Sequence, residues 1–272
     1  MKFELISNQE KASKRPTGRN MRFDFDVCKS STVCYHQPLY EQPLSKLQSA
    51  IHQGNTLEKL KGRYYKIESN GGYLHQHYPA VEYYKIVHRM ISDNVHTIRL
   101  SLEEISASQK AIENIHKEKK EKLSGGQTKL SFDTEIYQLR SSIFTFVFSV
   151  RATLDTIASL FQTIYGPQIG QHTSFNGFMS HIKSEKFVVK DAVLADYLEN
   201  NLEWFLLLKD VRDYLAHFGA VRFSLKESES NTLFIEIFRG IEVTCFTSTV
   251  YSGFKELLKF LDSHCTDVVK SA

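Results

Sequence analysis

The sequence has few cysteines and no long apolar run, and each shortage excludes a class of protein. Its four cysteines are Cys28, Cys34, Cys245 and Cys265. They are too few to hold 272 residues together by disulfides, so free thiols are expected. No apolar stretch approaches the roughly 20 residues of a membrane span, and the polar start MKFELISNQEKASKR lacks the apolar core of a secretory signal. The sequence therefore predicts a cytoplasmic protein with no membrane contact.

Several motifs of common enzyme classes are also missing. The chain has no Walker A loop, no glycine-rich dinucleotide motif, no G-x-S-x-G and no H-E-x-x-H. Cys28, Cys34, His36, His75 and His77 carry zinc-binding atoms, but their spacing matches no common zinc site. We therefore expect neither a metal nor another cofactor. The net charge of +3 is spread along the chain, which permits an anionic partner without requiring one.

The chain divides by composition near residue 78. Residues 1–78 form an irregular segment with short strands, predicted at Phe23–Val27 and Gly62–Glu68, and one short helix at Ser45–Gln53. From residue 79 onward apolar residues recur at helical spacing. The helices expected there are Ala80–Leu123, Asp133–Tyr165, Phe175–Ser184, Lys190–His217 and Val250–Ser263.

A switch to period-two alternation interrupts this helical region near its end. Val221–Lys226 and Thr232–Arg239 are typical of a hairpin, and Glu242–Thr247 of a third strand. The predicted fold class is therefore mainly α: an antiparallel helical bundle over residues 79–272 with a small β appendage at about 220–248 and an irregular N-terminal segment.

The segment KDVRDYLAHFG, Lys209–Gly219, ends a long helix and contains the strongest candidate site. On a helical wheel the apolar residues around Val211 and Leu215 share one face, and Arg212, Asp213 and His217 share the other. Asp213 precedes His217 by four residues and is expected to orient its ring by a hydrogen bond.

Arginine and histidine together suit chemistry on an RNA phosphate. A guanidinium matches phosphate geometry, and a histidine in the last helical turn can exchange protons near neutral pH. Such a pair can serve transesterification, in which a 2′-hydroxyl attacks the neighbouring phosphorus. An arginine ion pair and a solvated histidine explain the same residues without catalysis. Arg212 and His217 also lie about 140° apart on the wheel, so a second chain would have to complete one site.

The letters R-D-Y-L-A-H, Arg212–His217, resemble the R-x4-6-H signature of HEPN domains, in which a polar residue typically follows the arginine. The resemblance extends over about Asp133–Phe218, because the motif ends a long helix that follows a long antiparallel partner. It implies a bundle of four or five helices that dimerises, with arginine and histidine from both chains in one cleft.

The resemblance also implies a function. Many HEPN domains are metal-independent ribonucleases of toxin–antitoxin, phage-defence or CRISPR-associated systems, and leave a 2′,3′-cyclic phosphate and a 5′-hydroxyl. On this basis Arg212 and His217 are the expected catalytic residues, Asp213 supports them, and RNA and an antitoxin are expected partners. Other members are inactive, which leaves a second possibility: a non-catalytic module that binds RNA, a nucleotide or a protein.

Asp155 is the last candidate, four residues after Arg151 on the central helix. It can reach across to Arg212 and support it, or it can close an internal pair with Arg151. The internal pair is the simpler explanation of the spacing.

Overall fold

The computed structural model divides the chain into two units, Met1–Thr32 and Val33–Ala272. The described residues all belong to the second unit: 42–52, 64–68, 75–122, 133–165, 172, 174–182, 191–218, 223–227, 233–238 and 240–271. The strand predicted at Phe23–Val27 lies outside them.

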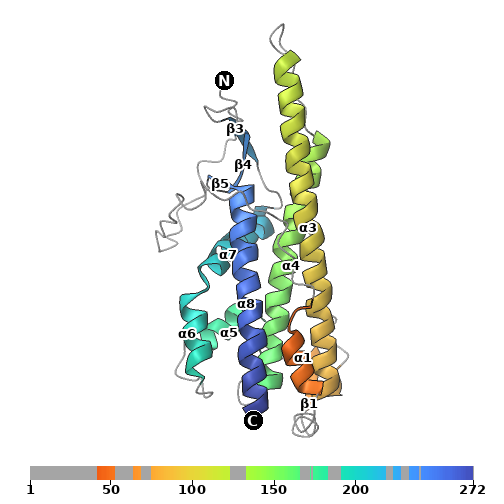
Figure 1. Ribbon diagram of the computed structural model, residues 1–272, viewed down its shortest axis with the longest axis vertical. Helices are drawn as coiled ribbons and strands as arrows, with labels where there is room; N and C mark the ends of the chain where they lie inside the picture. Colours follow the sequence, from red (N-terminus) through yellow and green to blue (C-terminus); the bar gives the residue numbers. More distant parts are fainter. Residues whose placement is uncertain are drawn as a thin grey trace. The chain divides into compact units, whose positions relative to one another are not determined.

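The described part of the chain is mainly helical, which confirms the predicted fold class. Its helices are α1 (Ser45–His52), α3 (Ala80–Lys122), α4 (Asp133–Tyr165), α5 (Phe175–Ile182), α6 (Ala192–Asn200), α7 (Glu203–Phe218) and α8 (Val243–Ser271) (Figure 1). They pack as an antiparallel bundle with a small sheet near the C-terminus.

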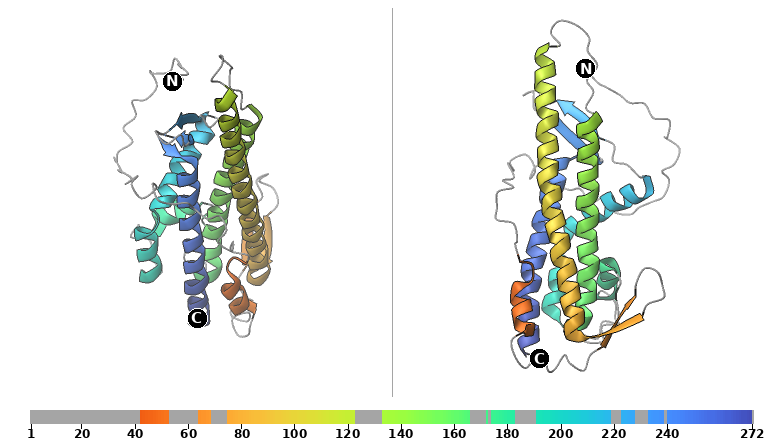
Figure 2. Two further views of the ribbon diagram at one scale, coloured as in Figure 1. Left: turned by 45° about the horizontal axis from the view of Figure 1, so that its top comes forward. Right: turned by 90° about the vertical axis from the view of Figure 1, so that its right-hand side faces the viewer.

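Helices α3 and α4 make the most extensive contact in this bundle and run antiparallel (Figures 1 and 2). Both have the bounds expected from their apolar periodicity, to within a residue. The side chains at that spacing are fully buried in α3 and in α4, as at Ile91, Ile98, Ile105, Ile143, Val147 and Val150. Burial of each such side chain contributes about 1.5–3 kcal/mol, so this contact is the main source of stability for the pair.

Helix α8 holds the other helices against this pair. It contacts α1, α4 and α7. The carboxylate of Asp262, a buried residue of α8, accepts a hydrogen bond from the backbone N–H of Leu47 at 3.0 Å. This bond satisfies a free N–H in the first turn of α1, so α1 is fixed by its end as well as by its apolar side chains.

The single helix predicted at Lys190–His217 is wrong, because the chain breaks into α6 and α7. Asn201 ends α6, where its backbone N–H and its side-chain amide both bond to the carbonyl of Tyr197. Asparagine competes for backbone groups in this way and favours helix ends. Leu202 stays buried at the break, so the apolar stripe continues from one helix into the next.

The strands form two small antiparallel sheets. β1 (Tyr64–Glu68) pairs with β2 (His75–Pro79), and β4 (Leu233–Phe238) lies between β3 (Ser224–Glu227) and β5 (Ile241–Glu242). The predicted hairpin is confirmed.

The strand predicted at Glu242–Thr247 is wrong, because α8 already begins at Val243. Val243, Phe246, Thr247 and Val250 are all buried. That is helical spacing, which the β-branched residues of this segment conceal.

Two cysteines lie within the described residues. Cys265 is a buried free thiol, as expected, and burial raises its pKa above the ordinary value. Cys245 is disulfide-bonded, so the expectation of free thiols is wrong there. A low cysteine count does not exclude one bond, because a disulfide needs only one close pair.

Helix α4 is apolar enough to pass a membrane-span test by length and composition, over Thr134–Phe161. Of the 18-residue stretch of this segment that is apolar enough to cross a membrane, 56% is buried inside the protein. The core helix of a soluble protein passes the same test. The contacts of α4 with α3, α5, α7 and α8 are those of such a core helix.

Gly253 of α8 lies where the helix touches Trp204 of α7. A methyl group on Gly253 would lie 2.2 Å from Trp204 Cδ1, and the buried indole also packs edge-on against Phe254. We expect Gly253→Ala to lower the free energy of unfolding by about 1–3 kcal/mol through overpacking, despite the higher helix propensity of alanine. Urea unfolding followed by the fluorescence of this single tryptophan measures the change. Ser252→Ala, at the exposed neighbouring position, is the control, and equal midpoints for both variants would contradict the prediction.

Candidate active site

The candidate catalytic residues lie on the C-terminal half of α7. Arg212 and Asp213 each expose 41% of the side chain, and His217 is exposed in the last turn. Val211 and Leu215 are buried, each at 1% exposure. The predicted division of this helix into an apolar and a polar face is therefore confirmed.

Asp213 contacts Arg212 and not His217. The guanidinium Nη1 of Arg212 donates to Asp213 Oδ1 at 2.9 Å. The structure gives no hydrogen bond to His217 from any described residue. The expectation that Asp213 orients the imidazole is wrong, because the long arginine side chain reaches the adjacent carboxylate first.

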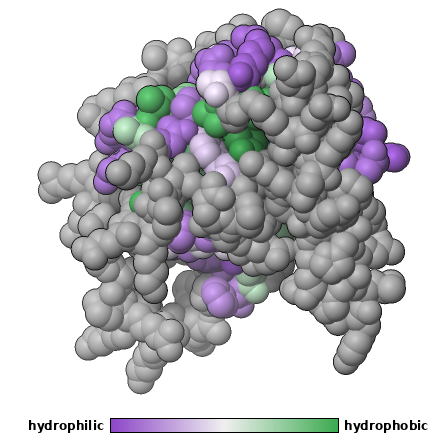
Figure 3. All heavy atoms as spheres, turned by 90° about the horizontal axis from the view of Figure 1, so that it is seen from below, coloured by the Kyte–Doolittle hydropathy of each residue, from purple (hydrophilic) through white to green (hydrophobic). Residues whose placement is uncertain are grey.

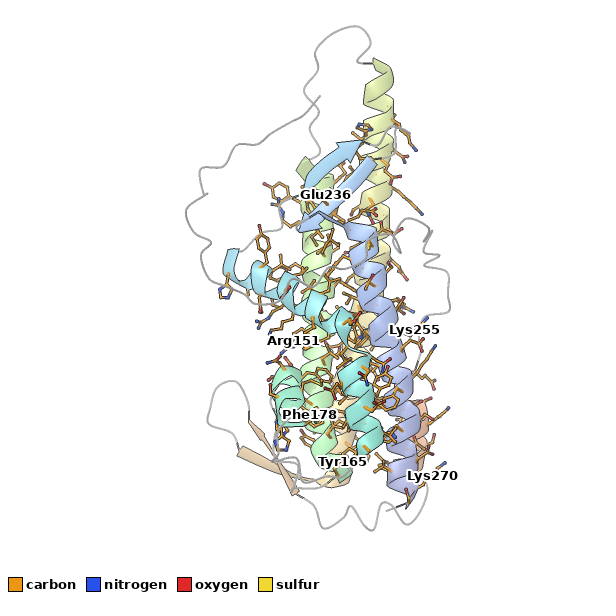
Figure 4. The ribbon with its side chains drawn as sticks, turned by 90° about the vertical axis from the view of Figure 1, so that its left-hand side faces the viewer. Arg151, Tyr165, Phe178, Glu236, Lys255 and Lys270 are labelled. Atoms are coloured by element: carbon orange, nitrogen blue, oxygen red, sulfur yellow. The ribbon has the colours of Figure 1, made fainter. Side chains whose placement is uncertain are left out.

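A second arginine–aspartate pair lies where α7 crosses α4 (Figure 4). Arg151 Nη2 is 3.3 Å from Asp155 Oδ1, and the Arg151 guanidinium carbon lies 5.3 Å from the centre of the Phe205 ring of α7. Asp155 Oδ1 also accepts a hydrogen bond from the backbone N–H of Phe175 at 2.8 Å. The internal Arg151–Asp155 pair is thus present, and the same carboxylate anchors the first turn of α5.

Arg212 lies close enough to Asp155 to act on it electrostatically. Burial raises the pKa of Asp155 above its ordinary value, while the N–H of Phe175 and the charges of Arg151 and Arg212 offset part of that rise. No hydrogen bond between Arg212 and Asp155 is present among the described contacts. The charge of Arg212 therefore acts on Asp155 at a distance, while the direct contacts of Asp155 are with Arg151 and Phe175.

Both arginines keep part of their hydrogen-bonding capacity. Arg151 Nη1 and Arg212 Nε are buried nitrogens without a hydrogen-bond partner in the described part of the chain. Arg151 thus pairs with Asp155 and Arg212 with Asp213, and each guanidinium group has one nitrogen left without a hydrogen bond among the described residues. We call Arg151, Asp155, Arg212 and Asp213 the arginine cluster.

His217 stands apart from this cluster. A separation of five residues puts it about 140° from Arg212 around α7. A pocket of about 400 Å³ lies elsewhere, between the start of α1 and the end of α8, and Figure 3 views that end of the bundle. Its lining includes Lys46, Ser263 and Lys270 but none of the predicted catalytic residues.

A second polar cluster, which the sequence did not reveal, joins the end of α4 and the start of α6 to the C-terminal third of α8. The hydroxyl of Tyr165 in α4 donates to Asp191 Oδ2 at 2.5 Å, and His264 Nε2 in α8 donates to the same oxygen at 2.7 Å. Asp191 Oδ1 accepts from the N–H of Leu194 and so caps α6. We call Tyr165, Asp191 and His264 the Asp191 cluster.

Ionisation of the Asp191 cluster is shifted by its contacts. Burial opposes the charge of Asp191, but the hydrogen bonds from Tyr165, Leu194 and His264 outweigh it and lower the pKa of this carboxyl. Burial raises the pKa of Tyr165. Of this cluster the sequence signals only the helix cap, an aspartate just before an apolar-periodic segment.

The zinc-binding atoms considered in the sequence lie outside the described side chains. His75 and His77 belong to β2, but their side chains are not described, and neither are Cys28, Cys34 and His36. Among the side chains that are described, no group of three histidines, cysteines or carboxylates is placed to hold a metal ion.

Comparison with protein-family models, with curated proteins and with solved structures finds no significant match to this chain.

Proposed function

We propose that the chain is a metal-independent HEPN-type endoribonuclease that cleaves RNA by 2′-hydroxyl transesterification. The observation that carries the proposal is the placement of Arg212 on α7, solvent-accessible and held beside Asp213 and Asp155, with His217 exposed on the same helix. A phosphate-binding group on a fixed support and a solvent-accessible imidazole are the two groups that such a reaction needs. A toxin or phage-defence role, with an antitoxin as partner, follows from the HEPN resemblance.

The reaction moves two protons. The 2′-oxygen forms a bond to phosphorus and loses its proton to an imidazole, while the bond from phosphorus to the 5′-oxygen breaks and that oxygen gains a proton. The products are a 2′,3′-cyclic phosphate and a 5′-hydroxyl. Arg212 stabilises the negative charge that develops on the phosphorus oxygens.

A second chain completes this site. Because Arg212 and His217 diverge by about 140°, one α7 helix does not direct both groups at one phosphorus. In a twofold dimer formed through α7, Arg212 of one protomer faces the imidazole of its partner. The dimer then has two such sites, each with the Arg212 of one protomer and the His217 of the other.

A non-catalytic module is the second candidate. The ion pair between Arg212 and Asp213 within one chain favours it, because a paired arginine explains the residue without chemistry. Such a module would bind RNA, a nucleotide or a protein and release the RNA uncut.

Incubation of the purified protein with RNA in EDTA tests the proposal. We expect cleavage, with 2′,3′-cyclic phosphate ends detected by mass spectrometry. An all-2′-deoxy strand of the same sequence should stay intact, because it lacks the nucleophile. Cleavage of the deoxy strand would exclude this mechanism, and binding without any cleavage would establish the non-catalytic module.

A further inference from the structure

The pocket of about 400 Å³ between α1 and the C-terminal turns of α8 has a polar lining on both walls. Its volume lies within the range of roughly 300–1,000 Å³ that is typical of small-molecule sites. Each helix contributes residues at helical spacing, so one face of α1 lies opposite one face of α8. The polar residues of the two walls include Ser45, Lys46 and Ser49 of α1, and Ser263, Asp267 and Lys270 of α8. We call this cavity the α1–α8 pocket.

The two walls of the α1–α8 pocket are fixed relative to each other. The hydrogen bond from the N–H of Leu47 to the buried carboxylate of Asp262 joins α1 to α8, and Leu47 and Ile51 are themselves fully buried. The two buried residues of the lining, Ala50 and Thr266, have small side chains that leave the space between the helices open. The pocket is therefore preformed, and a ligand does not have to order its walls.

The charged groups of the pocket are not paired with one another. Neither Lys46 nor Lys270 forms an ion pair with a described residue, although Asp267 lies one helical turn before Lys270 on α8 (Figure 4). The hydroxyls of the three serines likewise have no hydrogen bond among the described residues. Two ammonium groups, three hydroxyls and one carboxylate thus line a single cavity with their hydrogen-bonding capacity available to a ligand.

This set of groups matches a ligand that has a phosphate at one position and hydroxyl groups at another. Ammonium groups and serine hydroxyls donate to phosphate oxygens. A carboxylate repels a phosphate but accepts hydrogen bonds from sugar hydroxyls. An inorganic anion would use only the donors, and a neutral sugar would leave both lysines without a counter-charge. Ala50 is the single apolar residue of the described lining, so an apolar ligand finds little contact there.

We propose that the α1–α8 pocket binds a small sugar phosphate, with Lys46 and Lys270 on the phosphate and Asp267 on the sugar hydroxyls. The described lining contains no residue of the arginine cluster and does not include His217. The inference therefore goes beyond the proposed ribonuclease activity and does not depend on it. It assigns the chain a second ligand site, formed where the short N-terminal helix α1 packs on α8.

The test is isothermal titration calorimetry of the full chain with ribose 5-phosphate, inorganic phosphate and ribose, at one pH and one ionic strength. Wild type is expected to bind ribose 5-phosphate more tightly than phosphate, and ribose most weakly. Lys46→Met/Lys270→Met should weaken binding of both phosphate compounds about tenfold or more, because a hydrogen bond to a charged group contributes about that factor. Lys110→Met removes an exposed lysine from α3 and is the matched control, with wild-type affinity expected.

Asp267→Asn separates a sugar-phosphate site from a merely basic surface. It should weaken ribose 5-phosphate about fivefold or more through loss of the charged acceptor, and leave the affinity for inorganic phosphate unchanged or higher. A merely basic surface would bind both compounds more tightly once the acidic charge is removed, and that result would overturn the proposal. Absence of ribose 5-phosphate binding by wild type, or equal affinities of the double lysine variant and Lys110→Met, would overturn it as well. All the substituted positions are exposed, so thermal unfolding midpoints should match that of wild type.

Discussion

Replacing His217 by alanine is expected to slow RNA cleavage by about 10²–10⁴-fold, the usual contribution of a general acid or base. The ring is exposed and has no hydrogen bond among the described residues, so the free energy of unfolding should change by less than about 0.5 kcal/mol. The two readouts are initial cleavage rates in EDTA and thermal unfolding of the same preparation.

Arg212→Ala should reduce the cleavage rate by about 10²–10³-fold through loss of charge stabilisation at phosphorus. Arg212→Lys should recover little of it, because an ammonium does not reproduce the planar fork of donors. Asp210→Ala, at an exposed position two residues earlier on α7, is the matched control and should cleave at the wild-type rate.

Mixing the two inactive variants tests whether the site spans two chains. In a mixed dimer of Arg212→Ala and His217→Ala, one of the two sites keeps both wild-type residues and the other loses both. Random exchange makes half of the dimers mixed, so about a quarter of the wild-type activity should return. A site within one chain cannot be rescued in this way. Complete inactivity of the mixture, with exchange verified by sedimentation, would therefore exclude the shared site.

Local patterns were sufficient to predict the long helices but not where each one ends. Helices α3 and α4 could be predicted because apolar residues recur at helical spacing over many turns, without glycine or proline inside either helix. The break at Asn201 was missed because Leu202 preserves the apolar period across it. Residues 243–247 have β-branched and aromatic side chains, and only packing against the bundle makes them helical.

The candidate site shows the same limit. Arg212 and His217 share one helix, so their exposure followed from the wheel. The hydrogen-bond partner of Asp213 could not be predicted from the wheel. A wheel places only Cα positions, and the Arg212 side chain is long enough to reach the neighbouring carboxylate. The Asp191 cluster was out of reach of any local pattern, since its members are 26 and 73 residues apart and meet only when α4, α6 and α8 pack.

Asp191→Ala is expected to lower the free energy of unfolding by about 3–5 kcal/mol, the largest stability effect of any substitution considered for this chain. It removes the cap of α6, about 1 kcal/mol. It leaves the hydroxyl of the buried Tyr165 without its acceptor, about 1–3 kcal/mol, and takes the acceptor from Nε2 of the half-buried His264, about 1 kcal/mol. Urea unfolding measures the loss. Asp196→Ala, on the exposed side of the same helix, is the control and should change stability by less than about 0.5 kcal/mol.

Asp191 should also contribute to the loss of stability that the protein shows on acidification. The pKa of Asp191 is lower in the folded chain than in the unfolded one, so on acidification the unfolded chain takes up the proton first. The contribution of Asp191 to stability is therefore complete above its unfolded pKa of about 4 and is lost as the pH falls through the folded pKa. Asp155 acts in the opposite sense, because its pKa is raised by burial. Asp191→Asn keeps the shape and cannot titrate, so its free energy of unfolding should fall less steeply than that of wild type below about pH 4. Equal slopes for the two proteins would show that Asp191 is not shifted, and that its hydrogen bonds to Tyr165 and His264 contribute nothing specific to the charged form.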